Sequence, residues 1–213
     1  MIISKKHAVK SLFITLMLSL LFTNVHAQSP IKIMLYGDSL MAGYGLSQNE
    51  NLAAELSRKF KDSHSSISFI NASISGNTSK NGLSRVDWSI GDNPNIVILC
   101  LGANDMLRGL DPALTMNNLD LIISRFVSNN SIVILAGMQS PESMGPEYQS
   151  EFDGIYPELS NKYNLIFMPF LLEGVALEKE MLQADFKHPN AQGIKVIAKN
   201  LEPYIVQAIE RLK

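Results

Sequence analysis

Residues 31–40 read Ile31-Lys32-Ile33-Met34-Leu35-Tyr36-Gly37-Asp38-Ser39-Leu40. The apolar, β-prone run with one polar interruption predicts a mostly buried strand, and Gly37-Asp38-Ser39 predicts its end. Ligands bind at the carboxyl ends of strands in open α/β sheets, so a serine at this point is expected to face a substrate. Gly-Asp-Ser is also ordinary turn chemistry, so the rest of the chain has to distinguish a turn from a catalytic serine.

Strand and helix patterns alternate along the rest of the chain. Short apolar runs predict further strands at residues 67–70, 95–101, 131–137 and 165–168. Helical spacing predicts helices after the capping-box sequence at 47–50, over 83–90, after Asp111-Pro112, over 148–163 and over 194–212. Pro157 predicts a kink in its helix, and Pro203 predicts a break in the last one. The alternation predicts βαβ units in a three-layer α/β/α sandwich over a parallel sheet.

The amino terminus has the pattern of an export signal. Lysines at 5, 6 and 10 precede the apolar run 12–22, and Val25-His26-Ala27 places small residues where signal peptidase cleaves. The run is short for a membrane span, which disfavours a retained anchor. We therefore expect a signal peptide at residues 1–27 and one domain at 28–213, periplasmic or secreted and without a stable membrane anchor. The 213 residues, 46% of them hydrophobic, suit one globular domain with a sizeable core.

Charge and cysteine content disfavour several classes of function. Removal of residues 1–27 would take away three lysines and no acidic residue, so the formal net charge would change from −2 to −5. That charge disfavours nucleic-acid binding, and no nucleic-acid partner is expected. Cys100 is the single cysteine and lies in an apolar run, so it predicts a small core residue and no intrachain disulfide. The sequence has no HExxH or CxxC motif and too few histidines for a cluster, so no metal site is expected.

A serine nucleophile needs a base, most often a histidine held by a carboxylate. Beyond residue 27 the chain has two histidines, His64 and His188. His64 precedes the second predicted strand and is therefore expected at the opposite edge of the sheet from Ser39. His188 remains as the candidate, and Asp185, three residues earlier, can orient its ring. Asp-x-x-His is also found in ordinary surface turns.

Acyl transfer also needs hydrogen-bond donors for the oxyanion. Gly76 follows the second strand and can offer its N–H without a side chain in the way. Asn104 follows the third strand and can offer its side-chain amide. Gly76 could instead be a turn former, and Asn104 could cap its own loop. The turn interpretation does not predict that Ser39, Gly76 and Asn104 all follow strands, so we favour a catalytic site.

Four blocks resemble those of the SGNH, or GDSL-type, serine hydrolases, including their secreted thioesterase and arylesterase members. These are Gly37-Asp38-Ser39-Leu40, Gly76-Asn77, Gly102-Ala103-Asn104-Asp105 and Asp185-Phe186-Lys187-His188-Pro189. The resemblance covers essentially the whole chain beyond residue 27. It implies a flavodoxin-like sheet of five parallel strands, with Ser39 as nucleophile, His188 as base and Asp185 orienting it. It also implies an oxyanion hole formed by the amides of Ser39 and Gly76 and the Asn104 side chain.

The expected reaction is the hydrolysis of short- to medium-chain acyl, aryl or lysophospholipid-type esters and thioesters by a monomer. It is expected to proceed through an acyl-enzyme and to need no cofactor. Leu107, Leu110 and Met144 are expected to line the acyl pocket, because the acyl chain has to leave Ser39 past Asn104. Gln139 and Met144 stand where relatives often have arginine and tyrosine, so substrate preference does not carry over directly. A carbohydrate O-deacetylase and a non-catalytic acyl- or glycan-binding module are the alternatives on the same fold.

Overall fold

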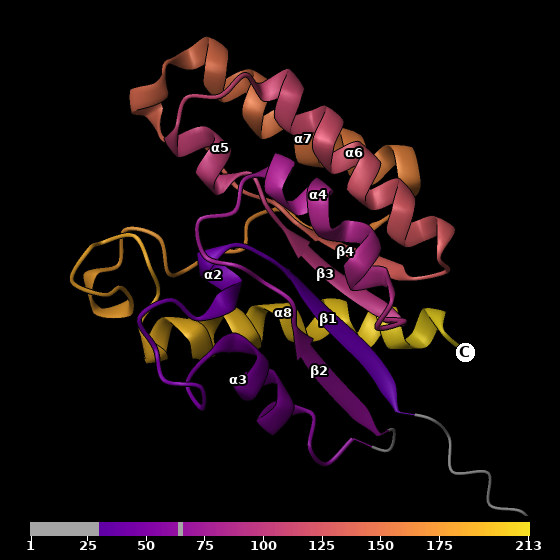
Figure 1. Ribbon diagram of the computed structural model, residues 1–213. Helices are drawn as coiled ribbons and strands as arrows, with labels where there is room; N and C mark the ends of the chain where they lie inside the picture. Colours follow the sequence, from indigo (N-terminus) through magenta and orange to yellow (C-terminus); the bar gives the residue numbers. More distant parts are fainter. Residues whose placement is uncertain (1–29, 64–65) are drawn as a thin grey trace, which may run out of the picture.

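The computed structural model describes residues 30–63 and 66–213, which form a parallel sheet with helices on both faces (Figure 1). The predicted signal peptide and His64 lie outside these residues. The strands are β1 (Ile31–Gly37), β2 (Ile67–Asn71), β3 (Ile96–Cys100), β4 (Ile132–Ala136) and β5 (Ile166–Met168). Their spatial order is β2-β1-β3-β4-β5, and all four pairings are parallel. This order is the flavodoxin-like one that the family resemblance implied.

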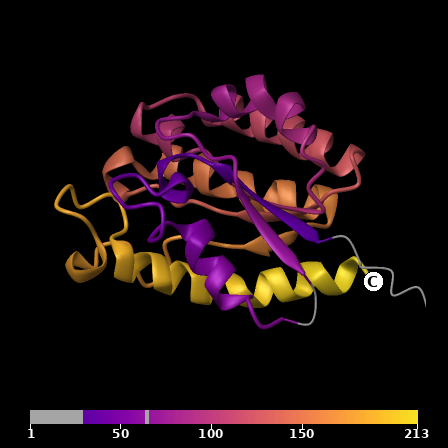
Figure 2. The same cartoon turned by 60° about the horizontal axis from the view of Figure 1, so that its bottom comes forward.

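Helices cover the two faces of the sheet as the predicted three-layer sandwich requires. They are α2 (Ser39–Ala42), α3 (Leu52–Lys59), α4 (Ser79–Ile90), α5 (Ala103–Leu107), α6 (Pro112–Ser128), α7 (Pro146–Tyr163) and α8 (Ala191–Arg211). Helices α3 and α8 lie on one face, and α4, α6 and α7 lie on the other (Figures 1 and 2). Within the described residues, none of these helices is long and apolar enough to cross a membrane.

The core is built around β3, the central strand. Every residue of β3 is buried, including Cys100 as predicted, because helices cover both sides of this strand. The edge strand β2 is only half-buried. From β1 the chain adds β2 on one side of the sheet and then β3, β4 and β5 on the other. The order in which strands are added therefore reverses between β1 and β3, which pair with each other. That reversal is the switch point at which open α/β sheets bind ligands, and Ser39 and Asn104 follow these two strands.

Two helices begin at different residues from those that the sequence predicts. Helix α3 begins at Leu52, because the Asn51 side chain accepts a hydrogen bond from the Ala54 N–H and caps it. The capping-box sequence at 47–50 forms a turn before the helix. Helix α4 begins at Ser79, earlier than predicted, because Thr78 and Asn81 form a true capping box. Its first turn is polar, so apolar spacing did not reveal it.

The predicted break at Pro203 is wrong, since α8 continues through it to Arg211. Pro203 has no N–H, so one carbonyl of the preceding helical turn lacks its usual donor. Because Pro203 is exposed, that carbonyl faces water rather than the core. Leu201 and Ile205 on either side are buried and hold the helix against the sheet. Pro157 likewise lies on the exposed side of α7, inside an uninterrupted helix.

Candidate active site

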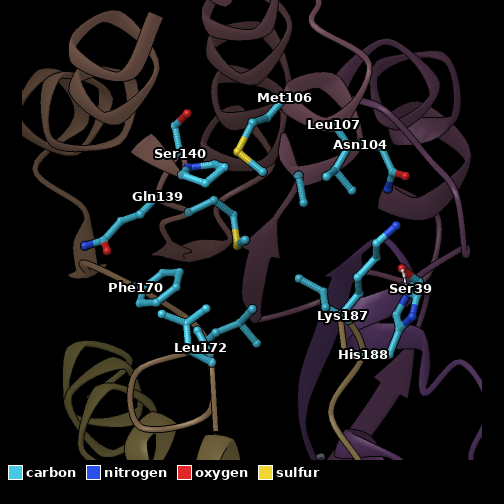
Figure 3. A pocket seen from close by; sticks show the side chains of 16 residues that line it. Ser39, Asn104, Met106, Leu107, Gln139, Ser140, Phe170, Leu172, Lys187 and His188 are labelled. Atoms are coloured by element: carbon cyan, nitrogen blue, oxygen red, sulfur yellow. Dashed lines mark hydrogen bonds between the residues drawn. The ribbon is translucent and has the colours of Figure 1, made fainter. Parts of the chain in front are cut away.

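Ser39, His188 and Asp185 form a hydrogen-bonded series, although Ser39 and His188 are 149 residues apart in the chain. Ser39 Oγ lies 2.9 Å from His188 Nε2, and His188 Nδ1 lies 2.6 Å from Asp185 Oδ2. Figure 3 shows Ser39 and His188 together at one end of a cavity. The structure thus brings together the three residues that the sequence singled out as nucleophile, base and orienting carboxylate.

A tight turn holds the histidine against its carboxylate. Asp185 Oδ1 accepts hydrogen bonds from the backbone N–H groups of Lys187 and His188, each at 3.0 Å. Hydrogen bonding from the His188 ring, and then from these two N–H groups, holds the pKa of Asp185 well below its usual range. Asp185 therefore stays ionised and can fix the tautomer in which Nδ1 carries the proton.

Gln183 joins the first and last blocks of the site, a role that the sequence did not suggest. Its Nε2 donates to the carbonyl of Tyr44 at 2.7 Å and to that of Pro189 at 2.9 Å. The Tyr44 ring lies beside the His188 ring, with 4.6 Å between the centroids. A glutamine in an irregular loop gives no sequence signal for such a contact, because its partners are backbone carbonyls.

Asp38 is buried beside Ser39 and contacts Asn104. Its Oδ1 accepts from the Leu40 N–H at 3.0 Å, and its Oδ2 accepts from Asn104 Nδ2 at 3.1 Å. Burial raises the pKa of Asp38 to about 6, although both hydrogen bonds oppose the shift. The carboxylate thus connects the end of β1 to the start of α5 and fixes one side of the Asn104 amide.

The three expected oxyanion donors differ in how free they are. Among the described residues, the N–H groups of Ser39 and Gly76 have no hydrogen-bond acceptor. Asn104 Nδ2, in contrast, lies 3.1 Å from Asp38 Oδ2 and 3.1 Å from the Asn77 carbonyl. Figure 3 shows this nitrogen turned toward Ser39. A substrate oxygen would therefore share one of its hydrogens in a three-centre hydrogen bond.

Two arginines hold the loop that carries Gly76. Arg108, at the end of α5, donates to the Gly76 carbonyl at 3.0 Å. Arg85, on α4, donates to Asn77 Oδ1 at 2.9 Å and to two strand-end carbonyls, Ala72 at 2.6 Å and Gly37 at 3.1 Å. Arg85 also lies over the Tyr36 ring at 4.0 Å. Sequence reasoning assigned this role to neither arginine, since their acceptors are mostly backbone atoms.

A largely apolar cavity of about 510 Å³ begins at Ser39 and His188. Leu107 lines it as predicted, whereas Leu110 and Met144 do not. Met144 lies in a separate hollow beside Tyr148. The loop after β4 is tied to α7 at Ser140, whose N–H donates to Asp153 at 2.7 Å and whose carbonyl accepts from Gln149 at 2.9 Å. The next turn therefore carries Met144 away from the cavity.

The opposite wall comes from a segment that the sequence left without a regular pattern. Phe170, Leu172, Ala176 and Leu177 line the cavity from the irregular stretch after β5. A sequence signal could have identified this wall. It is an apolar run that follows the carboxyl end of a strand and has neither strand nor helix spacing. Among the described residues, no group of three or more His, Cys, Asp and Glu side chains is placed to hold a metal ion.

Residues 35–196 match the GDSL-like Lipase/Acylhydrolase family. Esterase TesA of Pseudomonas aeruginosa is 33% identical over 172 residues, which cover 80% of this chain and 86% of that protein. Thioesterase 1/protease 1/lysophospholipase L1 of Escherichia coli strain K12 is 34% identical over 193 residues, covering 88% of this chain and 91% of that one.

Solved structures of esterases are also similar to this chain over most of its length. The psychrotrophic esterase EstA from Pseudoalteromonas sp. superposes with a TM-score of 0.80 at 31% identity, covering 84% of this chain and 99% of that chain. The crystal structure of TesA gives a TM-score of 0.79 at 32% identity over 83% and 99% of the two chains. The protein therefore belongs to the GDSL-like lipase/acylhydrolase family and is a hydrolase of ester bonds.

Proposed function

We propose that this protein is an exported serine esterase and thioesterase that works through an acyl-enzyme on Ser39. The observation that carries the proposal is the series of hydrogen bonds from Ser39 Oγ through the His188 ring to Asp185, at the mouth of an apolar cavity. A hydroxyl with a base at 2.9 Å can be deprotonated as it attacks a carbonyl carbon.

In the first half of the reaction, Ser39 Oγ attacks the substrate carbonyl and His188 Nε2 takes its proton. Asp185 stabilises the imidazolium that forms. The negative oxygen of the tetrahedral intermediate faces the N–H groups of Ser39 and Gly76 and the Asn104 amide. Collapse of the intermediate breaks the bond to the alcohol or thiol, which leaves with the proton from His188.

In the second half, water attacks the acyl group on Ser39. His188 takes a proton from the water and returns it to Ser39 Oγ when the ester bond breaks. The carboxylic acid leaves, and no cofactor enters this scheme. Ser39 and His188 take part in both halves of the reaction, so loss of either residue removes both steps. The same donors face the oxyanion in each half.

The proposed substrates are esters and thioesters with short to medium acyl chains, including aryl esters and lysophospholipids. The apolar walls of the cavity favour a hydrocarbon chain over a sugar. The names of the relatives, esterase and thioesterase 1/protease 1/lysophospholipase L1, support the same substrate classes. A carbohydrate O-deacetylase would need only a small acetyl site, which this cavity exceeds.

Hydrolysis of p-nitrophenyl butyrate by the purified protein tests the proposal. We expect Ser39→Ala and His188→Ala each to lose nearly all turnover, and the double variant to fall little further, because the two residues act as one unit. A fluorophosphonate should label Ser39 in the wild type, as read by mass spectrometry of the labelled peptide.

Three outcomes would contradict the proposal. A double variant that loses the product of the two single effects would mean that Ser39 and His188 do not act together. Release of acetate from acetylated sugars alone, with no butyrate hydrolysis, would favour the O-deacetylase. Binding of acyl compounds without any turnover would favour the non-catalytic module.

A further inference from the structure

A second hollow adjoins the acyl cavity, and Phe170 is a lining residue of both. This α8 hollow has a volume of about 460 Å³ and is lined by Pro169, Phe170, Glu173, Lys199, Pro203 and Tyr204, among others. We propose that Phe170 is the gate that limits acyl-chain length, and that the α8 hollow is a second acyl subsite that accepts the distal methylenes of longer chains when the ring is displaced. This inference rests on the proposed function.

The position of Phe170 suits a far wall. Figure 3 places Phe170 and Leu172 across the cavity from Ser39 and His188. An acyl chain attached to Ser39 therefore crosses the apolar interior before its end reaches the Phe170 ring. Because Phe170 also lines the α8 hollow, this residue stands between two spaces that are each large enough for part of an alkyl chain.

The backbone around Phe170 is held in place, so the ring is the part of this wall that can give way. The Leu171 N–H donates to the Gly137 carbonyl at 3.0 Å, just after Phe170. Asn200 Nδ2 on α8 donates to the Glu173 carbonyl at 2.9 Å. The Phe170 ring itself is half-buried and, among the described residues, stacks on no other aromatic ring.

The α8 hollow offers a mainly apolar surface to a chain that enters it. Pro169, Pro203 and the Tyr204 ring supply this surface. The charged groups of Glu173 and Lys199 belong to exposed residues, which can keep their charges in water. The hollow therefore fits methylene groups better than a polar headgroup, and this places the acyl side of the substrate here rather than the leaving group.

Phe170→Ala tests the gate. We would measure kcat/KM for p-nitrophenyl esters from butyryl to hexadecanoyl, each below its aggregation concentration as checked by light scattering. Each newly buried methylene favours binding by about fourfold, so the ratio of long-chain to butyryl kcat/KM should rise roughly tenfold or more. The leaving group is constant in this series, so the change reports on the acyl side alone.

Two further variants separate the gate from a merely larger cavity. Met138→Ala enlarges the acyl cavity without bordering the α8 hollow, and Lys199→Trp fills the hollow from α8. Lys199→Trp should cancel the long-chain gain of Phe170→Ala. Lys199→Trp added to Met138→Ala should change the chain-length profile of Met138→Ala by less than about twofold. Thermal unfolding of every variant shows whether the fold is retained.

The inference is overturned if folded Phe170→Ala has the wild-type chain-length profile. It is also overturned if Lys199→Trp fails to reduce the gain. Hydrolysis of the butyryl ester by the wild type distinguishes failure of the gate from failure of the proposed function. If the wild type hydrolyses no ester, the proposed function itself fails, whereas butyryl hydrolysis with an unchanged profile rejects only the gate.

Discussion

At the scale of single residues, Asp38 is the carboxyl group whose burial has the clearest cost. Its folded pKa of about 6 lies above the ordinary value of 3.8. Between these two values the unfolded chain binds fewer protons than the folded one, so folding stability falls as the pH rises through that range. The ionised form is nevertheless the one that can accept from both Leu40 and Asn104.

We predict that Asp38→Asn gains stability relative to the wild type as the pH rises, while losing activity. The gain should be about 2 kcal/mol between pH 4.5 and pH 7.5, because the wild type alone bears the growing cost of ionisation. The asparagine oxygen can accept from Leu40, but its amide NH2 group then faces the Asn104 amide and cannot accept from it. Asn104 loses this hydrogen bond, so kcat should fall about tenfold or more.

Urea unfolding at the two pH values measures the first effect, and ester hydrolysis measures the second. Equal changes in unfolding free energy for the wild type and Asp38→Asn would show that another group titrates in this range. Full activity in the variant would show that Asn104 keeps its position without the carboxylate.

The hydrogen-bonded series at the candidate site was predictable from sequence because side-chain chemistry defines its members. Ser39, Asp185 and His188 were identified from residue type, order and the ends of predicted strands, and the structure brings them within hydrogen-bond distance. Gln183 and Arg85 were not identified, since they act on backbone carbonyls that look alike in every sequence. Their roles depend on distances between distant segments, which only the folded chain defines.

At the scale of elements, Arg85 connects a helix to the ends of two strands. Its guanidinium donates to the Gly37 carbonyl at the end of β1, to the Ala72 carbonyl after β2, and to Asn77 in the loop that carries Gly76. Burial lowers the pKa of Arg85, but it stays charged, and hydrogen bonds to a charged donor are stronger than neutral ones.

We predict that Arg85→Met destabilises the fold by about 1–3 kcal/mol and lowers kcat, because three hydrogen bonds are lost and the Gly76 loop loses its anchor. Methionine keeps an apolar stem over Tyr36, so packing changes little. Chemical denaturation and ester kinetics measure the two effects. Arg125→Met on α6 removes only an exposed ion pair with Asp87 and should cost less than about 1 kcal/mol. Equal losses in the two variants would contradict an anchoring role.

Strands and long helices were predictable at this scale, and their polar ends were not. The buried strand β3 and the apolar face of α6 are continuous signals in the sequence. The short helices α2 and α5 escaped prediction, because they have four and five residues and no full turn of apolar spacing. The cavity wall at Phe170 escaped for a related reason, since it belongs to no regular element.

At the scale of the whole molecule, the first strand begins only a few residues after the predicted cleavage site. β1 starts at Ile31, and cleavage after Ala27 would leave it complete. We predict that the protein isolated from the periplasm or medium begins at Gln28, as determined by mass spectrometry of the intact chain. A variant that starts at Gln28 should keep the thermal stability and esterase activity of that protein. Recovery of the full-length chain in the membrane fraction would contradict export with cleavage.

The clamp made by Gln183 has a consequence for the order in which the protein is made. Tyr44, close to Ser39 in the chain, is joined through Gln183 to Pro189, so Ser39 and His188 meet only after the chain has been synthesised beyond Pro189. Helix α8, which covers β4 and β5, comes later still. A shorter nascent chain therefore carries Ser39 without His188. In the proposed mechanism, hydrolysis begins only after the last block of the site has been synthesised and has folded against the first.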